Sequence, residues 1–230
     1  MKTIYSILST ICLVVALSSC SHDVYNNKAF LKDNDLQGKK LAVLPVEVTL
    51  TGSQPKNSDW YAEEQSTSLS IQNELEHAYL QYTSSHSPKK HQQQVQMVDA
   101  NTVNQRLKTR VADLRTTWGM APDSLGRIAG ADLVLRVRMS RMRFMSDAAA
   151  KGINAGAFII DALINTKTNQ ISTLPRVKAS EVNYEISLID VKTGTVVSSF
   201  VNRPDKDNNG NSIRKGNEKM AEQSAVFAVR

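Results

Sequence analysis

The sequence predicts an α/β (α+β) sandwich in which helices pack on a mixed β-sheet. Three observations predict this class: a nearly continuous apolar run from Leu41 to Val48, an apolar repeat of helical period from Val103 to Leu114, and alternating segments on both sides of Gly194. The first suits a buried strand, the second an amphipathic helix and the third a hairpin. In chain order the expected elements are β-α-β-α-α-β-(insert)-β-β-α.

The chain begins with a segment typical of an exported protein. Met1-Lys2 is followed by a mostly apolar run, Ile4 to Leu17, and then by Ser18, Ser19 and Cys20. A basic start, a short apolar run and small residues at a cleavage point predict a signal peptide over residues 1–19. The run is too short, and too often interrupted by hydroxyl residues, to be a good membrane span.

Cys20 has two interpretations: a chance cysteine behind an ordinary signal peptide, or a lipid attachment site. The four residues Leu17-Ser18-Ser19-Cys20 resemble a bacterial lipobox. That resemblance implies cleavage before Cys20 and attachment of acyl chains such as palmitate to its thiol and its new amino group. Each buried CH₂ contributes about 0.8 kcal/mol to membrane binding, so several chains give a stable anchor. Cys12 leaves with the signal peptide, so the mature chain has no other thiol and cannot form a disulfide.

Composition limits the domain count and the partners. The formal charge of +6 becomes +5 when Lys2 leaves with the signal peptide. This charge would suggest nucleic acid for a basic cytosolic protein, but an exported lipoprotein does not meet that partner. Anionic headgroups or envelope polymers are nearer electrostatic neighbours, and the charge also simply keeps a domain soluble. We expect a polar, lipid-anchored tether over residues 20–38 and a single domain over residues 39–230.

The first strand and the first long helix are expected before residue 85. Residues 39–50 suit a buried strand in which Pro45, which has no N–H group, marks an end, an edge or a bulge. Asp59 is positioned to cap a helix that runs from Trp60 to about Ser84.

The middle of the chain predicts a short strand and two helices. The strand covers residues 95–99, and its last residue, Asp99, caps a helix over residues 100–118 that Gly119 closes. A shorter helix begins at Pro122 and ends at Gly130.

The last third predicts three strands and a helix. Apolar and polar residues alternate from Leu133, but the phase changes after Ser140, which predicts a β-bulge or a strand that leaves the sheet. Residues 182–201 form a hairpin whose turn uses the positive φ of Gly194. A final helix from Ser212 onward directs its apolar residues inward, namely Met220, Ala221 and Phe227.

An Ala/Gly-rich insert at about residues 146–176 separates two of these strands. Small residues four apart give a smooth helical ridge. The candidate contact residues are Ala148, Gly152, Gly156, Phe158, Ile159 and Ile160. Three interpretations stay open: a helix over the domain's own sheet, a contact with a neighbouring subunit or the membrane surface, and a membrane β-hairpin. We expect self-association through this insert.

Three stretches together carry a resemblance to a known superfamily. They are "GKKLAVLPVE" (38–47), "LGRIAGADLVLRVRM" (125–139) and "EISLIDVKTGTVVSSF" (185–200). Their order resembles the periplasmic lipoprotein superfamily of the curli secretion channel CsgG, the penicillin-binding-protein activator LpoB and the ring-forming PelC. The resemblance implies a three-layer sandwich similar to the N-terminal domain of TolB, without enzyme activity. It covers nearly the whole mature domain, although the single insert and the short polar loop at 202–211 depart from the two membrane hairpins of a CsgG-type channel.

Motifs for catalysis or metal binding are not found. The sequence has no G-x-S-x-G, H-E-x-x-H, P-loop or C-x-x-C pattern. His86 and His91 lie in a polar stretch without the spacing of metal ligands. We therefore expect no catalytic residue, no metal and no cofactor beyond the lipid on Cys20.

The sequence favours an envelope lipoprotein that acts as a structural, assembly or regulatory subunit through protein contacts, with other envelope proteins or with itself. A secretion-channel subunit of the curli type and a hydrolase of an envelope polymer are the alternatives. Ser21, by analogy with proteobacterial sorting, favours the outer membrane with the domain facing the periplasm.

Overall fold

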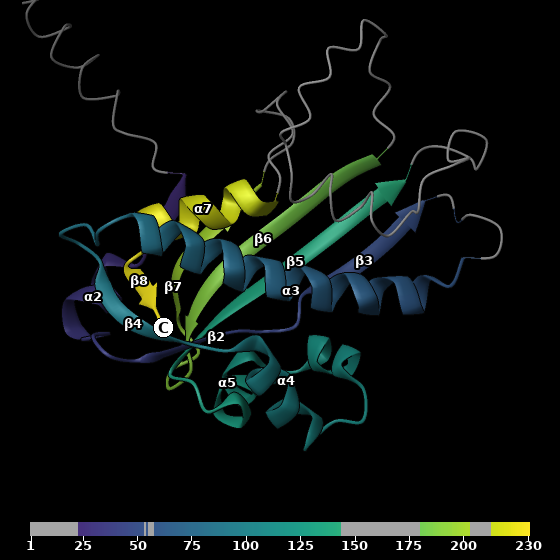
Figure 1. Cartoon of the computed structure of the whole chain (residues 1–230), viewed down its shortest axis with the longest axis horizontal. Helices are drawn as coiled ribbons and strands as arrows, with labels where there is room; N and C mark the ends of the chain where they lie inside the picture. The colour runs from purple at the N-terminus through teal and green to yellow at the C-terminus, as the bar shows by residue number, and fades with distance from the viewer. Residues whose placement is uncertain (1–22, 53, 55–57, 144–179, 203–212) are drawn as a thin grey trace, which may run out of the picture.

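The structure is a computed structural model that describes residues 23–52, 54, 58–143, 180–202 and 213–230. These residues form a mixed eight-stranded sheet with helices on both faces (Figure 1). The strands are β1 (Val24–Asn26), β2 (Lys40–Val43), β3 (Glu47–Gly52), β4 (Gln93–Val98), β5 (Leu133–Arg143), β6 (Ser180–Asp190), β7 (Val196–Val201) and β8 (Val226–Val229). The helices are α2 (Lys28–Asp33), α3 (Trp60–Ser85), α4 (Ala100–Lys108), the 3₁₀ helix η1 (Leu114–Gly119), α5 (Pro122–Ala129) and α7 (Ile213–Gln223).

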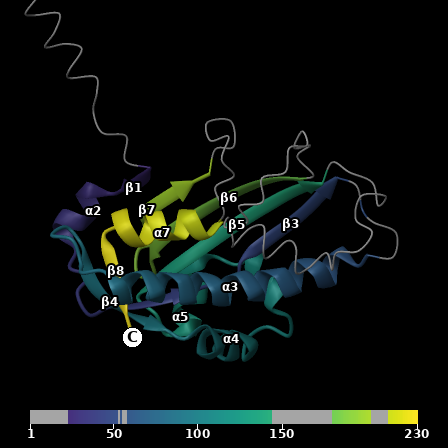
Figure 2. The ribbon, with the colours of Figure 1, turned by 45° about the horizontal axis from the view of Figure 1, so that its top comes forward.

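The sheet has the strand order β1-β7-β6-β5-β2-β4-β8, and β3 also pairs with β5. Helices α3 and α7 cover one face, where Leu41, Val43, Leu133 and Leu135 enter the larger core. The intervening residues Ala42, Leu44 and Val134 enter a second core with α4, η1 and α5. Figure 2 shows this second group of helices on the opposite side of the sheet from α7. The predicted sandwich of helices on a mixed sheet is confirmed.

Pro45 divides the first predicted strand into two. β2 pairs with the start of β5, and β3 pairs with its second half on the same edge. Leu44 donates its N–H to the carbonyl of Leu135 at 3.0 Å, and pairing stops at Pro45 because proline has no N–H to donate. Of the three roles predicted for Pro45, an end, an edge or a bulge, the structure shows a strand end.

The predicted tether is wrong from residue 24 onward. β1 pairs with β7 in antiparallel register, and α2 follows it with Asn27 as N-cap. Val24 and Leu36 are both buried. Backbone pairing with β7 and a few apolar side chains in a polar stretch fix the segment to the domain, and these side chains carry no periodicity from which a strand could be predicted.

The helix starts follow the predicted caps. The Asp59 carboxylate accepts from the N–H groups of Tyr61 and Ala62, and the Asp99 carboxylate accepts from those of Asn101 and Thr102. Gly130 ends α5 in the left-handed conformation, at φ 67°.

The predicted helix over 100–118 is too long. α4 ends at Lys108, and a separate 3₁₀ helix begins after Asp113. The reason is a second cap: the Asp113 carboxylate accepts from the N–H of Arg115 at 2.9 Å, so the chain starts a new helix there.

The predicted bulge in β5 is also wrong. β5 and β6 pair without a shift from Leu133–Asp190 to Arg143–Ser180. The alternation of apolar and polar residues changes phase because a charged residue, Arg141, occupies a core-facing position of the regular strand. Arg141 is buried, with 7 % exposure, beside Leu50 and Trp60. The irregularity lies instead between Leu188 and Ile189, where β6 pairs with β7.

The chain end forms a helix and then a strand. Met220 and Ala221 are buried in α7, as expected. Phe227 is buried too, but it lies in β8, which pairs in parallel with β4. The hairpin turn at Gly194 is confirmed, with φ 69°.

Candidate functional site: an open face of the sheet

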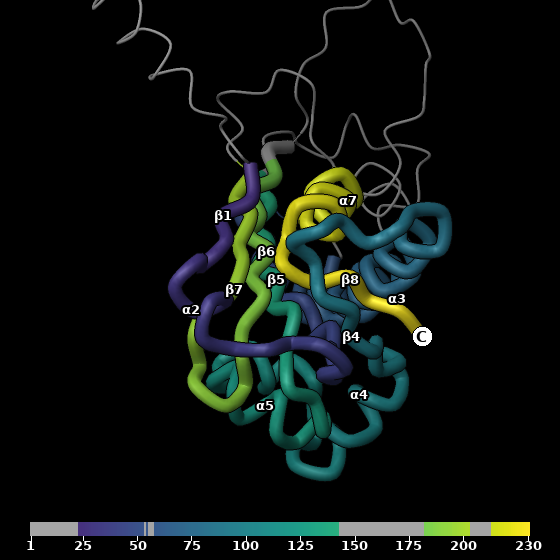
Figure 3. The backbone as a smooth tube through the Cα atoms, turned by 90° about the vertical axis from the view of Figure 1, so that its left-hand side faces the viewer, coloured from purple at the N-terminus to yellow at the C-terminus, as the bar shows by residue number. Residues whose placement is uncertain are grey.

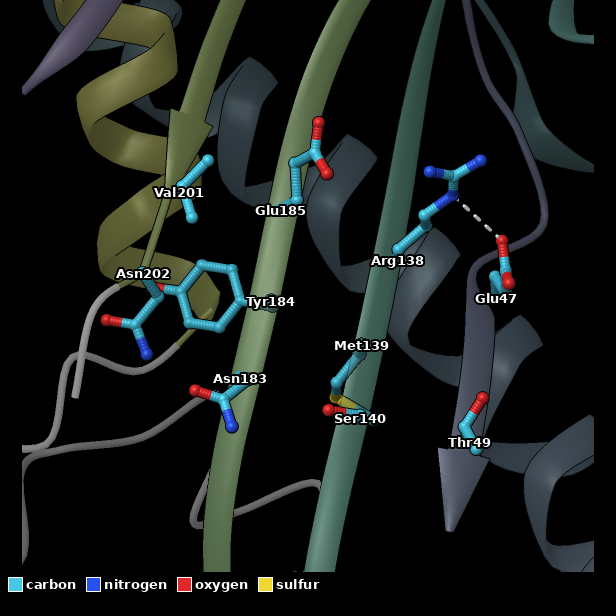
Figure 4. A pocket seen from close by; sticks show the side chains of 10 residues that line it. All are labelled: Glu47, Thr49, Arg138, Met139, Ser140, Asn183, Tyr184, Glu185, Val201 and Asn202. Atoms are coloured by element: carbon cyan, nitrogen blue, oxygen red, sulfur yellow. Dashed lines mark hydrogen bonds and ion pairs between the residues drawn. The ribbon is translucent and has the colours of Figure 1, made fainter.

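One part of the sheet carries no described helix. It is the face opposite α3 and α7, beyond the area that α4, η1 and α5 cover. We call this part the open face. It consists of three cross-strand rows of residues: Arg136–Ser187–Ser199, Glu47–Arg138–Glu185–Val201 and Thr49–Ser140–Asn183. Figure 4 shows the side chains of the second and third rows, with the helices behind the strands.

Paired charges occupy the centre of the open face. Glu47 on β3 accepts from Arg138 at 3.1 Å and from Arg136 at 3.2 Å (Figure 4 shows the first). Arg136 also donates to the carbonyl of Trp118 at 2.9 Å, which ties the face to η1. Glu185 accepts from the hydroxyl of Ser187 at 2.9 Å. The charges are thus held in place before any partner arrives.

Exposed apolar side chains surround these charges. Five large apolar side chains are exposed in the described part of the chain, and strand alternation places four on this side of the sheet. They are Tyr25 (56 %), Val201 (51 %), Met142 (48 %) and Val196 (38 %). Such a gathering is typical of an interaction site, whereas apolar residues scattered singly over a surface need no explanation.

A shallow depression of about 400 Å³ lies between these rows, bordered by Glu47, Arg138, Asn183, Glu185 and Val201. Its side chains supply charges, hydroxyls and two amides, those of Asn183 and Asn202, but neither histidine nor cysteine. The arrangement can bind a surface of complementary charge.

A second polar cluster, at the start of α3, holds the fifth exposed side chain, Tyr61. Its hydroxyl donates to the carboxylate of Asp113, and the guanidinium of Arg115 lies 4.6 Å from its ring centroid. The hydrogen bond from Tyr61 lowers the pKa of Asp113, and the same bond raises the pKa of Tyr61. These contacts join α3 to η1, so we assign the cluster a structural role.

The three stretches that carry the family resemblance meet at Asp132. Its N–H donates to the carbonyl of Lys40, its carboxylate accepts from the N–H of Lys40, and its carbonyl accepts from the N–H of Val191, each at 2.9 Å. Asp190 shapes the adjoining turn by accepting from the N–H and hydroxyl of Thr193. The motif residues thus connect neighbouring strands and shape a turn, so they serve the fold.

None of the predicted site residues belongs to the open face as it is described above. Cys20 and the insert residues Ala148, Gly152, Gly156, Phe158, Ile159 and Ile160 lie outside the described residues. Within those residues, His86 stacks on Tyr82, and no group of three His, Cys, Asp or Glu side chains is arranged for a metal ion. No helix in the described ranges is both long and apolar enough to cross a membrane. Sequence reasoning missed the open face, although the polar alternation of Arg136, Arg138 and Ser140 signalled it.

Comparison with known proteins gives structural matches alone. No family model and no curated protein sequence matches the chain. The structure is similar to lipoprotein GNA1162 from Neisseria meningitidis, with 11% identity, coverage of 75% of this chain and 86% of that chain, and a TM-score of 0.35. It is also similar to the LpoB C-terminal domain from Salmonella enterica, with 15% identity, 76% and 88% coverage, and a TM-score of 0.33. A PelC dodecamer from Paraburkholderia phytofirmans matches with 12% identity, 88% and 97% coverage, and a TM-score of 0.30. LpoB and PelC are two of the proteins that the three sequence stretches resemble.

Proposed function

We propose that this protein is an envelope lipoprotein, anchored through Cys20 in the outer membrane and facing the periplasm. It acts without catalysis, as a structural, assembly or regulatory subunit that binds another envelope protein or a second copy. The observation that supports this proposal is the open face, where four of the five large apolar side chains that are exposed among the described residues lie around fixed ion pairs.

The composition of the face fits a protein partner. Interfaces combine apolar contacts with arginine and with hydrogen-bonded rims. Here Arg136 and Arg138 are held by Glu47, so their guanidinium groups lose little further freedom on binding.

The size of the face indicates a transient contact. From Arg136 to Met142 it extends about 20 Å along the strands, and from β3 to β1 about 20 Å across them. This projected area of roughly 400 Å² is about half of the ~800 Å² that each partner contributes to a standard interface. A common membrane would raise the local concentration of a partner anchored in it and so compensate for weak affinity.

A photo-crosslinking amino acid at Asn183 tests the docking surface. Asn183 is exposed on the open face, and His77, exposed on α3, is the matched control position. In living cells we expect a crosslinked species of defined mass from Asn183 and not from His77. Crosslinks that form only within a single molecule, or equal crosslinking from residues 183 and 77, would contradict the proposal.

A charge reversal supplies an independent test. Arg138→Glu reverses the central charge of the face and places a carboxylate beside Glu47 and Glu185. It should abolish the crosslink from Asn183, whereas Arg110→Glu, the same change at an exposed site after α4, should leave it intact.

The lipid anchor has its own test. Cys20→Ala should abolish labelling by a palmitate analogue and release the protein from the membrane fraction. Label that persists in this variant would refute the assignment. Conductance of the purified protein in planar bilayers would favour the channel alternative, and turnover of an envelope polymer would favour the hydrolase.

A further inference from the structure

The first strand of the domain begins very close to the proposed lipid anchor. Only Ser21, His22 and Asp23 separate Cys20 from β1. β1 is firmly held, because it pairs with β7 and buries Val24. The Asp23 carboxylate also accepts from Lys219 on α7 at 2.5 Å, and the Asn26 amide donates to the carbonyl of Gln223 at 2.9 Å.

The short connection limits the distance between domain and membrane. Four peptide units, from Cys20 to Val24, span at most about 14 Å when fully extended. A domain of this size is about 40 Å across, from its expected radius of gyration. The start of β1 therefore stays within about a third of the domain's width from the lipidated residue.

Two exposed apolar side chains lie at this place. Val201 follows Phe200, the partner of Val24, and so lies beside Asp23 at the end of β7. Tyr25 pairs with Ser199 on the same side of the sheet. Their exposures are 51 % and 56 %. We call Asp23, Tyr25 and Val201 the anchor-side edge; Figure 3 shows β1 and β7 side by side, away from α3.

We propose that the anchor-side edge is a membrane-contact surface, held on the lipid headgroups by the three-residue connection. The inference rests on the proposed acylation of Cys20. Tyrosine suits the boundary between headgroups and water, because its ring is apolar and its hydroxyl is polar. Val201 adds apolar surface, while the rest of the open face, from Glu185 to Glu47, remains available to a protein partner.

Fluorescence quenching by labelled lipid tests this surface. Because the mature chain has no thiol except that of Cys20, a single added cysteine takes up a thiol-reactive fluorophore. Val201→Cys and Tyr25→Cys report on the edge, and Lys192→Cys, exposed in the turn at the other end of the β6–β7 hairpin, is the control. The acylated proteins are inserted into vesicles of phosphatidylethanolamine and phosphatidylglycerol, with or without a headgroup nitroxide.

We expect the nitroxide lipid to quench the fluorophore at residues 201 and 25 strongly and the one at residue 192 weakly. A long Gly/Ser spacer inserted after Ser21 should remove this difference. Equal quenching at the three positions, or a difference that survives the spacer, would overturn the inference. Intact mass separates the two proposals: a chain without acyl mass overturns the lipid anchor and this inference together, whereas an acylated chain with equal quenching overturns this inference alone.

Discussion

Glu64 on α3 accepts a hydrogen bond from the backbone N–H of Leu50, 2.9 Å away, at the outer edge of β3. The carboxylate is nearly buried, with 6 % of the residue exposed, and its second oxygen lies 2.5 Å from Arg115. In the described part of the chain β3 pairs with β5 alone, so its other edge presents unpaired backbone groups. Glu64 satisfies one of them and obstructs pairing with another strand.

Glu64→Ala should therefore destabilise the domain. It leaves the Leu50 N–H without its acceptor and Arg115 without its carboxylate, and we expect a loss of about 1–3 kcal/mol in the free energy of unfolding. Urea denaturation measures this loss. Glu64→Gln, which keeps an acceptor oxygen, should lose less; an equal loss in both variants would show that the charge on Arg115 dominates.

Gly216→Ala tests the close packing of α7 on the sheet. A Cβ at residue 216 would lie 2.7 Å from the ring of Tyr184 and 2.9 Å from that of Phe200. Both rings are buried, so the helix must shift, and we expect a net cost of about 1–3 kcal/mol even though alanine is the better helix former. Gly119→Ala is the control, because nothing lies within 4 Å of its Cβ position. A thermal melt of both variants in parallel decides the matter, and similar melting temperatures would contradict the packing argument.

We expect the buried hydroxyl of Tyr79 to make the domain lose stability at alkaline pH. Its hydroxyl donates to the carbonyl of Val226 at 3.1 Å, and burial raises its pKa from 10.0 to about 12. The folded state therefore holds this proton where the unfolded chain releases it, so the contribution is complete below pH 10 and is lost as the pH rises through about 12. The full effect is about 3 kcal/mol. The stability of Tyr79→Phe should fall less steeply over this interval in urea titrations at successive pH values, and parallel curves for the two proteins would rule this out.

The carboxylate of Asp190 should contribute to stability at the hairpin turn. Its carboxylate is nearly buried, accepts from the N–H of Thr193 at 2.9 Å and lies 3.6 Å from the ammonium group of Lys39. Asp190→Ala should cost about 1–3 kcal/mol, because it leaves these donors without an acceptor. Lys192→Ala, an exposed neighbour in the same turn, should change the urea midpoint little. An unchanged midpoint for Asp190→Ala would show that water replaces the carboxylate.

Local chemistry explains which elements could be predicted from the sequence. Asp59, Asp99 and Gly130 each determine a helix end through their own backbone or side chain, so their neighbours in sequence suffice. Pro45 divides a strand for the same reason. β1 was not predictable, because a strand of three residues is stabilised by β7, about 170 residues further along the chain.

The open face could be predicted only in part. Alternation in β5 and β6 assigns Arg138 and Glu185 to the side away from the larger core. The sequence does not show that α4, η1 and α5 cover just one end of that side, because this depends on how the second core packs. The burial of Arg141 could not be predicted for the same reason: it lies beside Leu50 and Trp60, which are distant in sequence.

The positions of the first and last strands have a consequence for folding kinetics. β1 and β8 occupy the two ends of the strand order, and they pair with β7 and β4, which are remote from them in the chain. Contacts of such long sequence separation slow folding, because the connecting chain must be ordered before they form. The β1 end of the sheet cannot form until β7 has been made, and the β8 end cannot form until Val226–Val229 have been made. Slow folding of this kind would favour export in an unfolded state, which the predicted signal peptide would require.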